Sequence, residues 1–311
     1  MRDDPTDLPV AGLSPDEAAR FDRGDARFSQ VFRASQGLGP VYIRASCAAC
    51  HAGDGRGPGF VERAVAVGPD GYTPLEGSSA FPYGPVLRPY YLPPATRGVE
   101  PDEGAELLRS TRVGPPVFAR GWIAAVSDEA IVAAAEREAR EGRVRGRVAR
   151  LDDGRVGRFG LKARVATLEA FTADAFVSDM GLTSPARPVE VPNAEGVTDD
   201  ARPGVDLTAD DIDDVSFYVR ALALPRREGL TDAGRAAFAR AGCADCHAPS
   251  LATRPDARPA VMAGASAELY SDLLLHDMGV GLADGAREGA AGPRDWRTAP
   301  LVGLRFARRL M

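Results

Sequence analysis

One five-residue motif occurs twice in this chain of 311 residues, and its copies use all four cysteines and two of the three histidines. Residues 47–51 read Cys-Ala-Ala-Cys-His, and residues 243–247 read Cys-Ala-Asp-Cys-His. C-x-x-C-H is the attachment sequence of c-type haem, in which both thiols face the haem vinyl groups and the adjacent imidazole faces the iron. Two covalently bound haems are therefore predicted. The attachment residues are Cys47, Cys50, Cys243 and Cys246, and the proximal iron ligands are His51 and His247.

Three other uses of these cysteines explain the pattern less well. A structural zinc site needs four ligands brought together, whereas the two pairs lie far apart in the sequence and each has its own histidine. A thioredoxin-like dithiol needs one C-x-x-C after a strand, and the histidine has no role there. Disulfides are disfavoured because cysteines three apart on a helix pair poorly and no cysteine lies outside the motifs.

The composition suits a soluble globular protein long enough for two domains, with 44% hydrophobic and 26% charged residues. The net charge of −6 and the pI near 5.3 argue against a nucleic-acid partner. The arginine-rich stretch 137–158 is interrupted by acidic residues, so we expect a solvated face there. No apolar run is long enough for a transmembrane segment.

The first residues of the chain, Met1-Arg2-Asp3-Asp4-Pro5, lack the apolar region of a secretory signal. Covalent haem attachment takes place outside the bacterial cytoplasm, so we expect a periplasmic location. Three interpretations stay open: the signal was removed or never included, the start is misassigned, or the motifs are empty. We prefer the first two.

Helix signals appear in both halves of the chain. Ser14 and Glu17 form a capping box with Pro15 at the first helical position, which predicts a helix that opens the first domain. Thr231 precedes a similar helix before the second motif. Further helices are expected over 128–141, 166–177 and 208–222.

The fold is expected to be mainly α, with two cytochrome c-like haem domains and long irregular haem-wrapping loops. The proline-rich segment 187–207 is predicted to link an N-terminal haem domain, 1–186, to a C-terminal one, 208–311. The region that follows the first motif, rich in glycine over 53–59 and in proline over 82–94, is predicted to be such a loop.

A G-x-x-x-F spacing precedes each motif, as Gly24 with Phe28 and as Gly234 with Phe238. A small residue followed one turn later by an aromatic one suits an entry helix that crosses another helix closely and covers a haem edge. We therefore expect both haem domains to begin in the same way.

The supply of distal iron ligands differs between the two haems. His276 is the one histidine left after the motifs, and no histidine or methionine lies between His51 and Met180. Haem 1 must therefore take a sixth ligand from far away, use Tyr or Lys, or leave an open site where peroxide could bind. For haem 2, Met278 is a candidate ligand, and the alternative is a core methionine at a glycine-capped helix end.

Several segments together resemble the bacterial dihaem c-type oxidoreductases, a peroxidase-like family also labelled thiol oxidoreductases. This family is similar to dihaem cytochrome c peroxidases and to the methylamine dehydrogenase maturation enzyme. The segments are 37–51, 157–163, 179–184, 270–279 and 296–301.

The resemblance implies a division of labour. Haem 2, at the higher potential, takes electrons from a small donor protein and passes them to haem 1, where hydrogen peroxide is cleaved. Acid–base groups assist that cleavage in the related peroxidases, but no catalytic residue can be assigned here by position. The alternative is a dihaem electron-transfer cytochrome without a substrate of its own.

The resemblance also adds a second candidate ligand for haem 2. In the related peroxidases a methionine just before a His-Asp-Gly segment ligates the electron-transfer haem, and Met311 stands at that position. Because the family pattern continues beyond it, the chain is expected to be cut short at its C-terminus. The related peroxidases hold calcium between their domains, so calcium is a further candidate cofactor.

Overall fold

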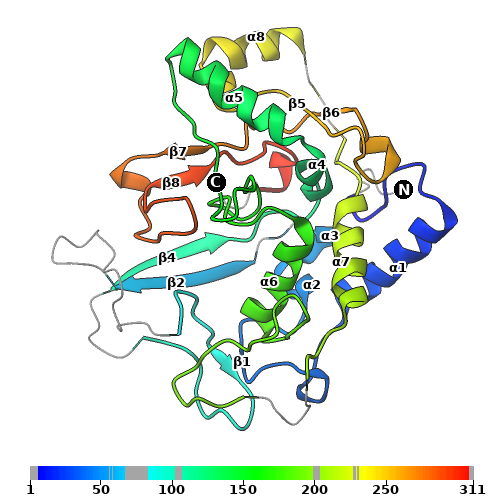
Figure 1. Cartoon of the computed structure of the whole chain (residues 1–311), viewed down its shortest axis with the longest axis vertical. Coiled ribbons are helices and arrows are strands. Elements are labelled where there is room, and N and C mark those ends of the chain that lie inside the picture. Colours follow the sequence, from blue (N-terminus) through cyan, green and yellow to red (C-terminus); the bar gives the residue numbers. More distant parts are fainter. Residues whose placement is uncertain are drawn as a thin grey trace.

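The computed structural model describes residues 6–307 apart from 56, 58, 67–82, 102–106, 199–203, 227–228 and 230 (Figure 1). The helices of these residues are α1 (Pro15–Ser29), α2 (Cys47–Cys50), α3 (Ala52–Gly55), α4 (Arg120–Ala125), α5 (Asp128–Glu141), α6 (Leu168–Met180), α7 (Ala209–Ala221) and α8 (Asp232–Arg240). The strands are β1 (Val41–Tyr42), β2 (Phe60–Ala66), β3 (Tyr90–Tyr91), β4 (Leu107–Val113), β5 (Leu251–Ala252), β6 (Ser266–Ala267), β7 (Leu275–Asp277) and β8 (Asp295–Arg297). They form four two-stranded antiparallel sheets, β1–β3, β2–β4, β5–β6 and β7–β8.

Local capping signals place several helices where the sequence predicts them. The Ser14–Glu17 capping box opens α1, and Thr231 caps α8. The helix α5 has the predicted bounds, whereas α6 begins two residues later than predicted and ends three residues later. A capping box of Thr208 and Asp211 opens α7.

The main hydrophobic core lies where α1, α4, α6 and α7 meet. Gly24 of α1 approaches α7 so closely that a Cβ on it would lie 2.1 Å from the carbonyl oxygen of Asp214. Phe21 and Phe28 pack their rings against Tyr218 of α7, with centroids 4.9 and 5.2 Å away. The helix after the predicted linker thus packs against a helix of the N-terminal half, and the two cytochrome c-like domains with boundaries at 186 and 208 stay a prediction.

The expectation of a haem-wrapping loop after the first motif is wrong for Phe60–Ala66. These residues form β2, which pairs along its whole length with β4. The alternation of apolar and polar side chains in this segment is weak, and its partner lies about forty residues further on. Pairing over such a distance depends on tertiary contacts that a local pattern does not encode.

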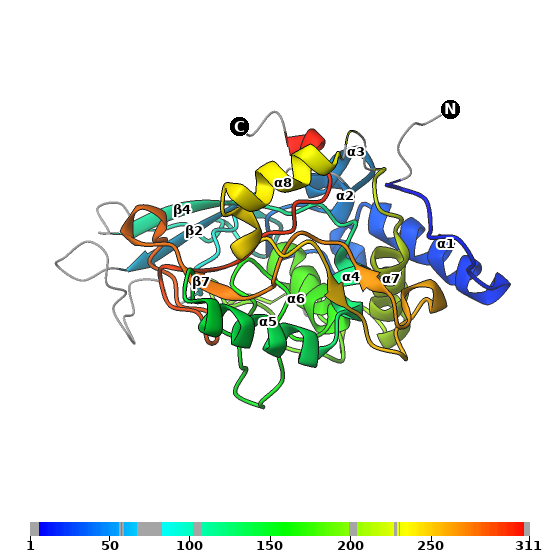
Figure 2. The same ribbon diagram turned by 90° about the horizontal axis from the view of Figure 1, so that it is seen from above.

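The two predicted entry helices have different surroundings. Figure 1 shows α8 at the upper edge of the molecule, and Figure 2 shows it apart from α5. No described residue of α8 is buried, whereas Phe21, Gly24 and Phe28 of α1 are. Within the part of the chain that the structure describes, no helix has the length and apolarity needed to cross a membrane.

Candidate functional site

The first motif folds into one helical turn, α2. The Ser46 hydroxyl accepts a hydrogen bond from the Ala49 amide at 3.1 Å, and the His51 amide donates to the Cys47 carbonyl at 2.9 Å. Cys47, Cys50 and His51 all line one cavity. We call these three residues and that cavity site 1.

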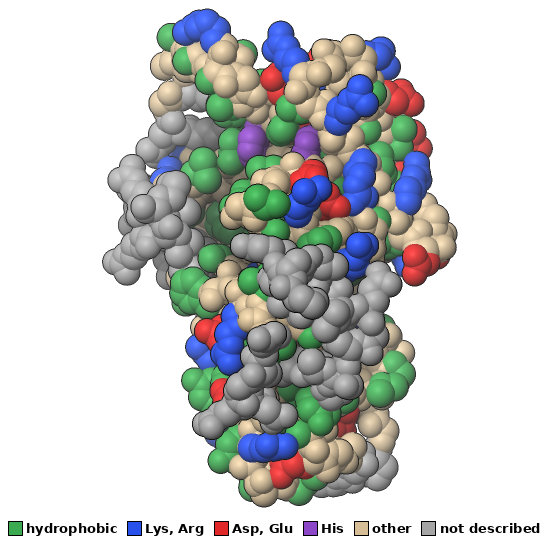
Figure 3. Space-filling view, turned by 90° about the vertical axis from the view of Figure 1, so that its left-hand side faces the viewer, with side chains coloured by type: hydrophobic (Ala, Val, Ile, Leu, Met, Phe, Trp, Pro, Cys, Tyr) green, Lys and Arg blue, Asp and Glu red, His purple; other side chains and the backbone are tan. Residues whose placement is uncertain are grey.

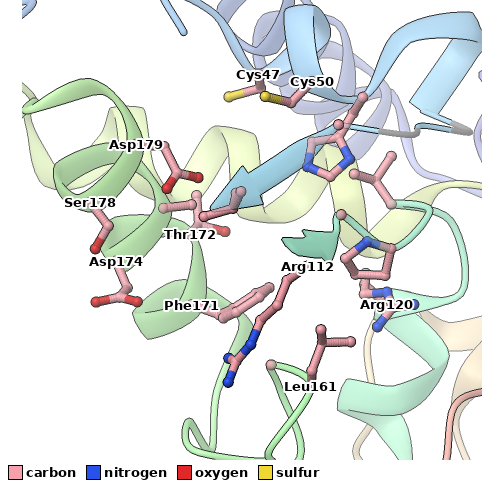
Figure 4. A pocket seen from close by; sticks show the side chains of 18 of the residues that line it. Cys47, Cys50, Arg112, Arg120, Leu161, Phe171, Thr172, Asp174, Ser178 and Asp179 are labelled. Atoms are coloured by element: carbon pink, nitrogen blue, oxygen red, sulfur yellow. The ribbon is translucent and has the colours of Figure 1, made fainter. Parts of the chain in front are cut away.

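The cavity of site 1 opens to solvent. Together with that opening it holds about 1350 Å³ of empty space. Figure 4 shows Cys47 and Cys50 on one wall and Arg112, Leu161 and Phe171 on the opposite wall. The charged residues in its lining are Arg63, Arg112, Arg120, Arg164, Asp174, Asp179 and Glu288.

Two glycines shape the cavity next to the motif. A Cβ on Gly59 would lie 2.6 Å from the Cβ of Cys50, which is closer than real side chains approach. A Cβ on Gly114 would lie 3.4 Å from Cε1 of His51. A side chain at position 59 would therefore collide with Cys50, whereas a Cβ at position 114 would make an ordinary contact with the imidazole.

The imidazole of His51 suits a metal ligand. Its Nδ1 is buried and has no hydrogen-bond partner among the described residues. Burial, and then the positive charge of Arg120, lower its pKa to about 4. The ring is therefore neutral near pH 7, which is the form that binds iron.

The two thiols of site 1 are free and protonated. Burial, followed by the negative charge of Asp179, raises the pKa of Cys47 to about 12 and also raises the pKa of Cys50. Reduced, protonated thiols beside a cavity are what covalent attachment to a ligand requires, and they are poor nucleophiles on their own.

Three arginines of the cavity share one carboxylate. Arg63 lies 2.9 Å, Arg112 2.5 Å and Arg164 3.3 Å from Glu288. Arg112 also pairs with Asp284. The segment 284–288 thus joins the C-terminal part of the chain to the wall of site 1.

Lys162 anchors the same C-terminal segment. Its ammonium group is fully buried and donates to the carbonyl oxygens of Ala286 and Gly292, both at 2.9 Å. It also lies 2.9 Å from the carboxylate of Asp284 and over the ring of Trp296. A buried ammonium with this many acceptors is well compensated and fixes the segment that carries Glu288.

Asp179 is the carboxyl of site 1 that is best placed to exchange a proton. It lies near the end of α6, where its carbonyl accepts from the Ile43 amide at 2.7 Å. No described residue donates a hydrogen bond to its carboxylate, and Figure 4 shows the carboxylate beside Cys47 at the cavity. Burial raises its pKa to about 6, which lies near the range useful for acid–base catalysis. The sequence indicated the segment that begins with Asp179 but not this role.

No described residue offers site 1 a strong second iron ligand. His51 is the one histidine in the lining, and no methionine, tyrosine or lysine is part of it. Met180 and Met262 are buried in the hydrophobic core, at 3% and 0% exposure. Among the described residues, the lining therefore contains neither the Tyr nor the Lys that the sequence left as an alternative ligand.

The second motif lies at the surface. Residues Cys243–Asp245 form a short 3-10 turn, in which Cys243 is exposed, and Cys246 and His247 are half-buried. Nδ1 of His247 donates to the carbonyl oxygen of Tyr270 at 2.8 Å, which leaves Nε2 as the free lone pair. We call Cys243, Cys246 and His247 site 2.

His276 does not serve as a free distal ligand. Its Nε2 lies 3.0 Å from the carboxylate of Asp272, and its Nδ1 lies 3.9 Å from Sγ of Cys246. The buried Glu138 lies nearby, since a Cβ on Gly146 would meet both Glu138 and His276 within 3 Å. His276 therefore lies beside an attachment cysteine of site 2, held by a buried carboxylate.

Of the two candidate methionine ligands of site 2, the structure describes only Met278. Met278 is 49% exposed and follows a strand, so the alternative of a core methionine at a helix end is wrong. Met311 lies outside the described residues.

Among the residues the structure describes, Cys246, Asp272 and His276 form a three-residue group that could hold a metal ion. Its sulfur and nitrogen donors do not suit calcium, which takes oxygen ligands.

The chain matches the model of one protein family over residues 6–65 and 103–310. That family is described as di-haem oxidoreductase, putative peroxidase, and the match includes both motifs. The chain belongs to the di-haem oxidoreductases. No curated protein and no solved structure matches this di-haem oxidoreductase significantly.

Membership implies haem cofactors, and site 1 of this di-haem oxidoreductase fits one by its chemistry. Its imidazole is buried and neutral, its free thiols face the cavity, and Gly59 leaves no side chain against Cys50. Site 2 offers the same donors at the surface. Figure 3 shows a face on which histidine reaches the surface among arginines, acidic groups and apolar side chains.

Proposed function

We propose that this di-haem oxidoreductase is a periplasmic peroxidase that binds a c-type haem at each site. Site 1 would hold the haem at which hydrogen peroxide is reduced (haem 1), and site 2 would hold the haem that receives electrons from a small donor protein (haem 2). The observation that carries the proposal is a contrast between the two sites. At site 1 the motif lines a cavity whose described residues offer no second strong ligand, whereas at site 2 the motif lies at the surface. A haem held at site 1 would leave room for peroxide, and a haem held by the surface motif of site 2 would be accessible to an electron donor.

The residues of site 1 divide into holding and proton-moving groups. Cys47, Cys50 and His51 would hold the haem, and its iron supplies the redox chemistry when bound. Reduction of hydrogen peroxide to two water molecules consumes two electrons and two protons. Asp179, with a pKa of about 6, can accept a proton from bound peroxide at its carboxylate and return it to the leaving oxygen. Phe171 and Leu161 form an apolar part of the cavity wall, which limits the water that competes with peroxide for site 1.

At site 2 the protein supplies a surface-exposed motif and candidate methionine ligands. Met278 and Met311 are the candidates, and a methionine raises the potential of a haem, which suits electron entry. Periplasmic location follows from the requirement of covalent attachment, and calcium between the two domains stays a candidate.

The rival function is a dihaem electron-transfer cytochrome without a substrate. Steady-state turnover separates the two, because an enzyme consumes hydrogen peroxide in proportion to oxidation of a small reduced cytochrome, two molecules for each peroxide. The protein is matured with a cytochrome c assembly system, and a denaturing gel stained for haem first establishes covalent attachment. Haem-loaded protein that oxidises no donor in the presence of peroxide would favour the rival.

A further inference from the structure

One buried arginine of site 1 has no anionic partner. The guanidinium of Arg120 is 6% exposed and lines the cavity, and its Nε donates to the Pro116 carbonyl at 3.1 Å. Among the described residues no carboxylate lies within ion-pair distance of it, although every other arginine in the lining has one. A buried cation without an anion is unfavourable, so an anion bound in the cavity would gain a charged partner there.

The backbone holds Arg120 in place. Arg120 is the first residue of α4, and Ala119 before it has a φ of 68°, an uncommon conformation for a residue with a side chain. Gly121 packs against α7 so closely that a Cβ on it would lie 1.8 Å from the Arg220 carbonyl oxygen. Because α4 begins in fixed contact with α7, Arg120 cannot swing its charge to solvent.

A second buried arginine lies behind the first. Arg297 of β8 is 5% exposed and donates to the carbonyl oxygens of Gly160 and Thr298, at 3.1 and 2.9 Å. It too has no carboxylate at ion-pair distance among the described residues. Burial, and then the charge of Arg297, lower the pKa of Arg120 to about 9, so Arg120 remains a cation near pH 7. Together the two arginines make this wall of the cavity electropositive.

The position of this wall favours one source of the negative charge. The vinyl groups and the propionates of a haem lie at opposite edges of the macrocycle, and the thiols of Cys47 and Cys50 mark the vinyl edge. Figure 4 shows Arg120 on a different wall from these cysteines. A haem attached to the cysteines therefore directs its carboxylates away from them, and the unpaired guanidinium is a fitting partner.

We propose that Arg120 binds a propionate carboxylate of the haem at site 1. The proposal rests on the proposed haem attachment. Arg120 acts as a positioning residue: it keeps the propionate ionised, and its charge, with that of Arg297 behind it, raises the reduction potential of that haem. An ion pair between guanidinium and carboxylate also orients the macrocycle against His51.

The test compares haem-loaded Arg120→Gln, Arg120→Lys and wild type by spectroelectrochemical titration. In Arg120→Gln the equilibrium constant for reduction of haem 1 falls at least tenfold, a shift of about 59 mV for one electron. The Gln variant also gains a pH dependence of this potential between about pH 5 and about pH 8, because its propionate now titrates. Arg120→Lys retains most of the wild-type potential.

The matched control is Arg158→Gln. Arg158 is equally buried but lies outside the cavity lining, and it pairs with Asp128. Its loss leaves the haem 1 potential unchanged. An Arg120→Gln potential within threefold of wild type in reduction constant, or an equal shift in the control, overturns the proposal.

A second measurement does not depend on any Arg120 variant. Infrared spectra of wild-type protein with carbon-13 labelled propionates report whether they titrate, and loss of the cysteines at site 2 removes the other haem from the spectrum. A site 1 propionate that stays ionised down to about pH 5 supports the proposal, and one that titrates as a free acid overturns it.

Added formate or benzoate tests the other source of negative charge. If either changes the haem 1 spectrum only when Arg120 is present, a soluble carboxylate occupies the site and the propionate proposal is wrong. Absence of haem on the stained gel ends the proposed function itself. Haem-loaded protein with an unaltered potential in Arg120→Gln ends this inference alone.

Discussion

The two C-x-x-C-H regions of this protein carry the same five-residue pattern in opposite environments. At site 1 the motif lines a large cavity, and its imidazole has lost its ordinary basicity through burial. At site 2 the first cysteine is exposed, and the imidazole is held by a backbone carbonyl. The motif is the same at both sites, whereas the surroundings differ, and this difference supports the proposed roles of chemistry at site 1 and electron entry at site 2.

The helices that precede the motifs explain part of this difference. Gly24 lets α1 cross α7 at close range, and Phe28 is buried with its ring centroid 6.1 Å from that of His51. A Cβ on the equivalent Gly234 would contact only the hydroxyl of Thr231. Phe238 packs on the ring of Tyr270 at the surface. The same G-x-x-x-F spacing therefore leads to a close helix crossing at α1, whereas Gly234 of α8 approaches no other helix among the described residues.

The largest expected effect comes from removing the proximal ligands one at a time. His51→Ala abolishes both steady-state peroxide reduction and the spectral change that peroxide causes. His247→Ala abolishes steady-state turnover with the donor, but ferric protein still shows the peroxide-dependent change at haem 1. Stopped-flow spectroscopy distinguishes the two, and a loss of the direct peroxide response in His247→Ala contradicts the assignment of roles.

Asp179→Asn tests the proton-moving group of site 1. The rate of peroxide cleavage falls by about 10²–10⁴-fold, and the inflection of the wild-type rate near pH 6 disappears. Asp174→Asn is the matched control, because Asp174 lies in the same helix and cavity but pairs with Arg164 and Arg187. The measurement is the pH profile of the single-turnover rate. If both variants keep the inflection near pH 6, Asp179 is not the proton-moving group.

Gly59→Ala tests how tightly the protein packs around the motif of site 1. The new methyl group collides with the backbone and Cβ of Cys50, so the free energy of unfolding drops by about 1–3 kcal/mol and less haem is attached at site 1. Gly281→Ala is the control, since a Cβ there meets nothing within 4 Å. Denaturant unfolding and haem content per chain are measured, and equal values for the two variants would show that site 1 is not tightly packed around its motif.

The smallest expected effect concerns the carboxylates behind site 2. Burial, with the nearby Asp272, raises the pKa of Glu138 from 4.5 to about 7. The folded protein therefore holds an extra proton between these values, and stability is lost as the pH rises through about 7. Burial alone lowers the pKa of His276, but Asp272 and Glu138 raise it overall. This raised pKa also makes the stability of the folded protein fall as the pH rises.

Glu138→Gln removes this pH dependence without removing the hydrogen bond from the Gly146 amide, which is 2.7 Å long. Relative to wild type, the variant gains on the order of 1 kcal/mol of unfolding free energy between about pH 5 and about pH 8. The exposed Glu141→Gln in the same helix shows no such gain. Urea titrations at several pH values measure the unfolding free energy. If it depends on pH in the same way in both variants, the pKa of Glu138 is not raised by burial.

Much of the local structure was predictable because its signals are local. The capping residues Ser14, Thr208 and Thr231 begin helices where the sequence places them, and α5 keeps its predicted bounds. The β2–β4 pair was missed because its strands are separated by a long segment and have weak alternation. Local patterns specify helices better than distant strand pairs.

The site was predictable in part for the same reason. The motifs identified Cys47, Cys50 and His51, and the structure brings them to one cavity. Asp179 and Arg120 were not predicted, because their significance depends on burial and on the absence of a partner, which appear only after folding. The segment from Asp179 matched the family resemblance, but nothing in the sequence separates a carboxylate that moves protons from one that pairs with arginine.

The ferric spin states of the matured protein test the central claim most directly. Electron paramagnetic resonance of the wild type, of the Cys47→Ala/Cys50→Ala variant and of the Cys243→Ala/Cys246→Ala variant assigns each signal to one site. The account predicts a high-spin haem at site 1 that responds to peroxide and cyanide, and a low-spin haem at site 2 that does not. Two low-spin haems inert to both ligands, or a high-spin signal that belongs to site 2, would contradict it.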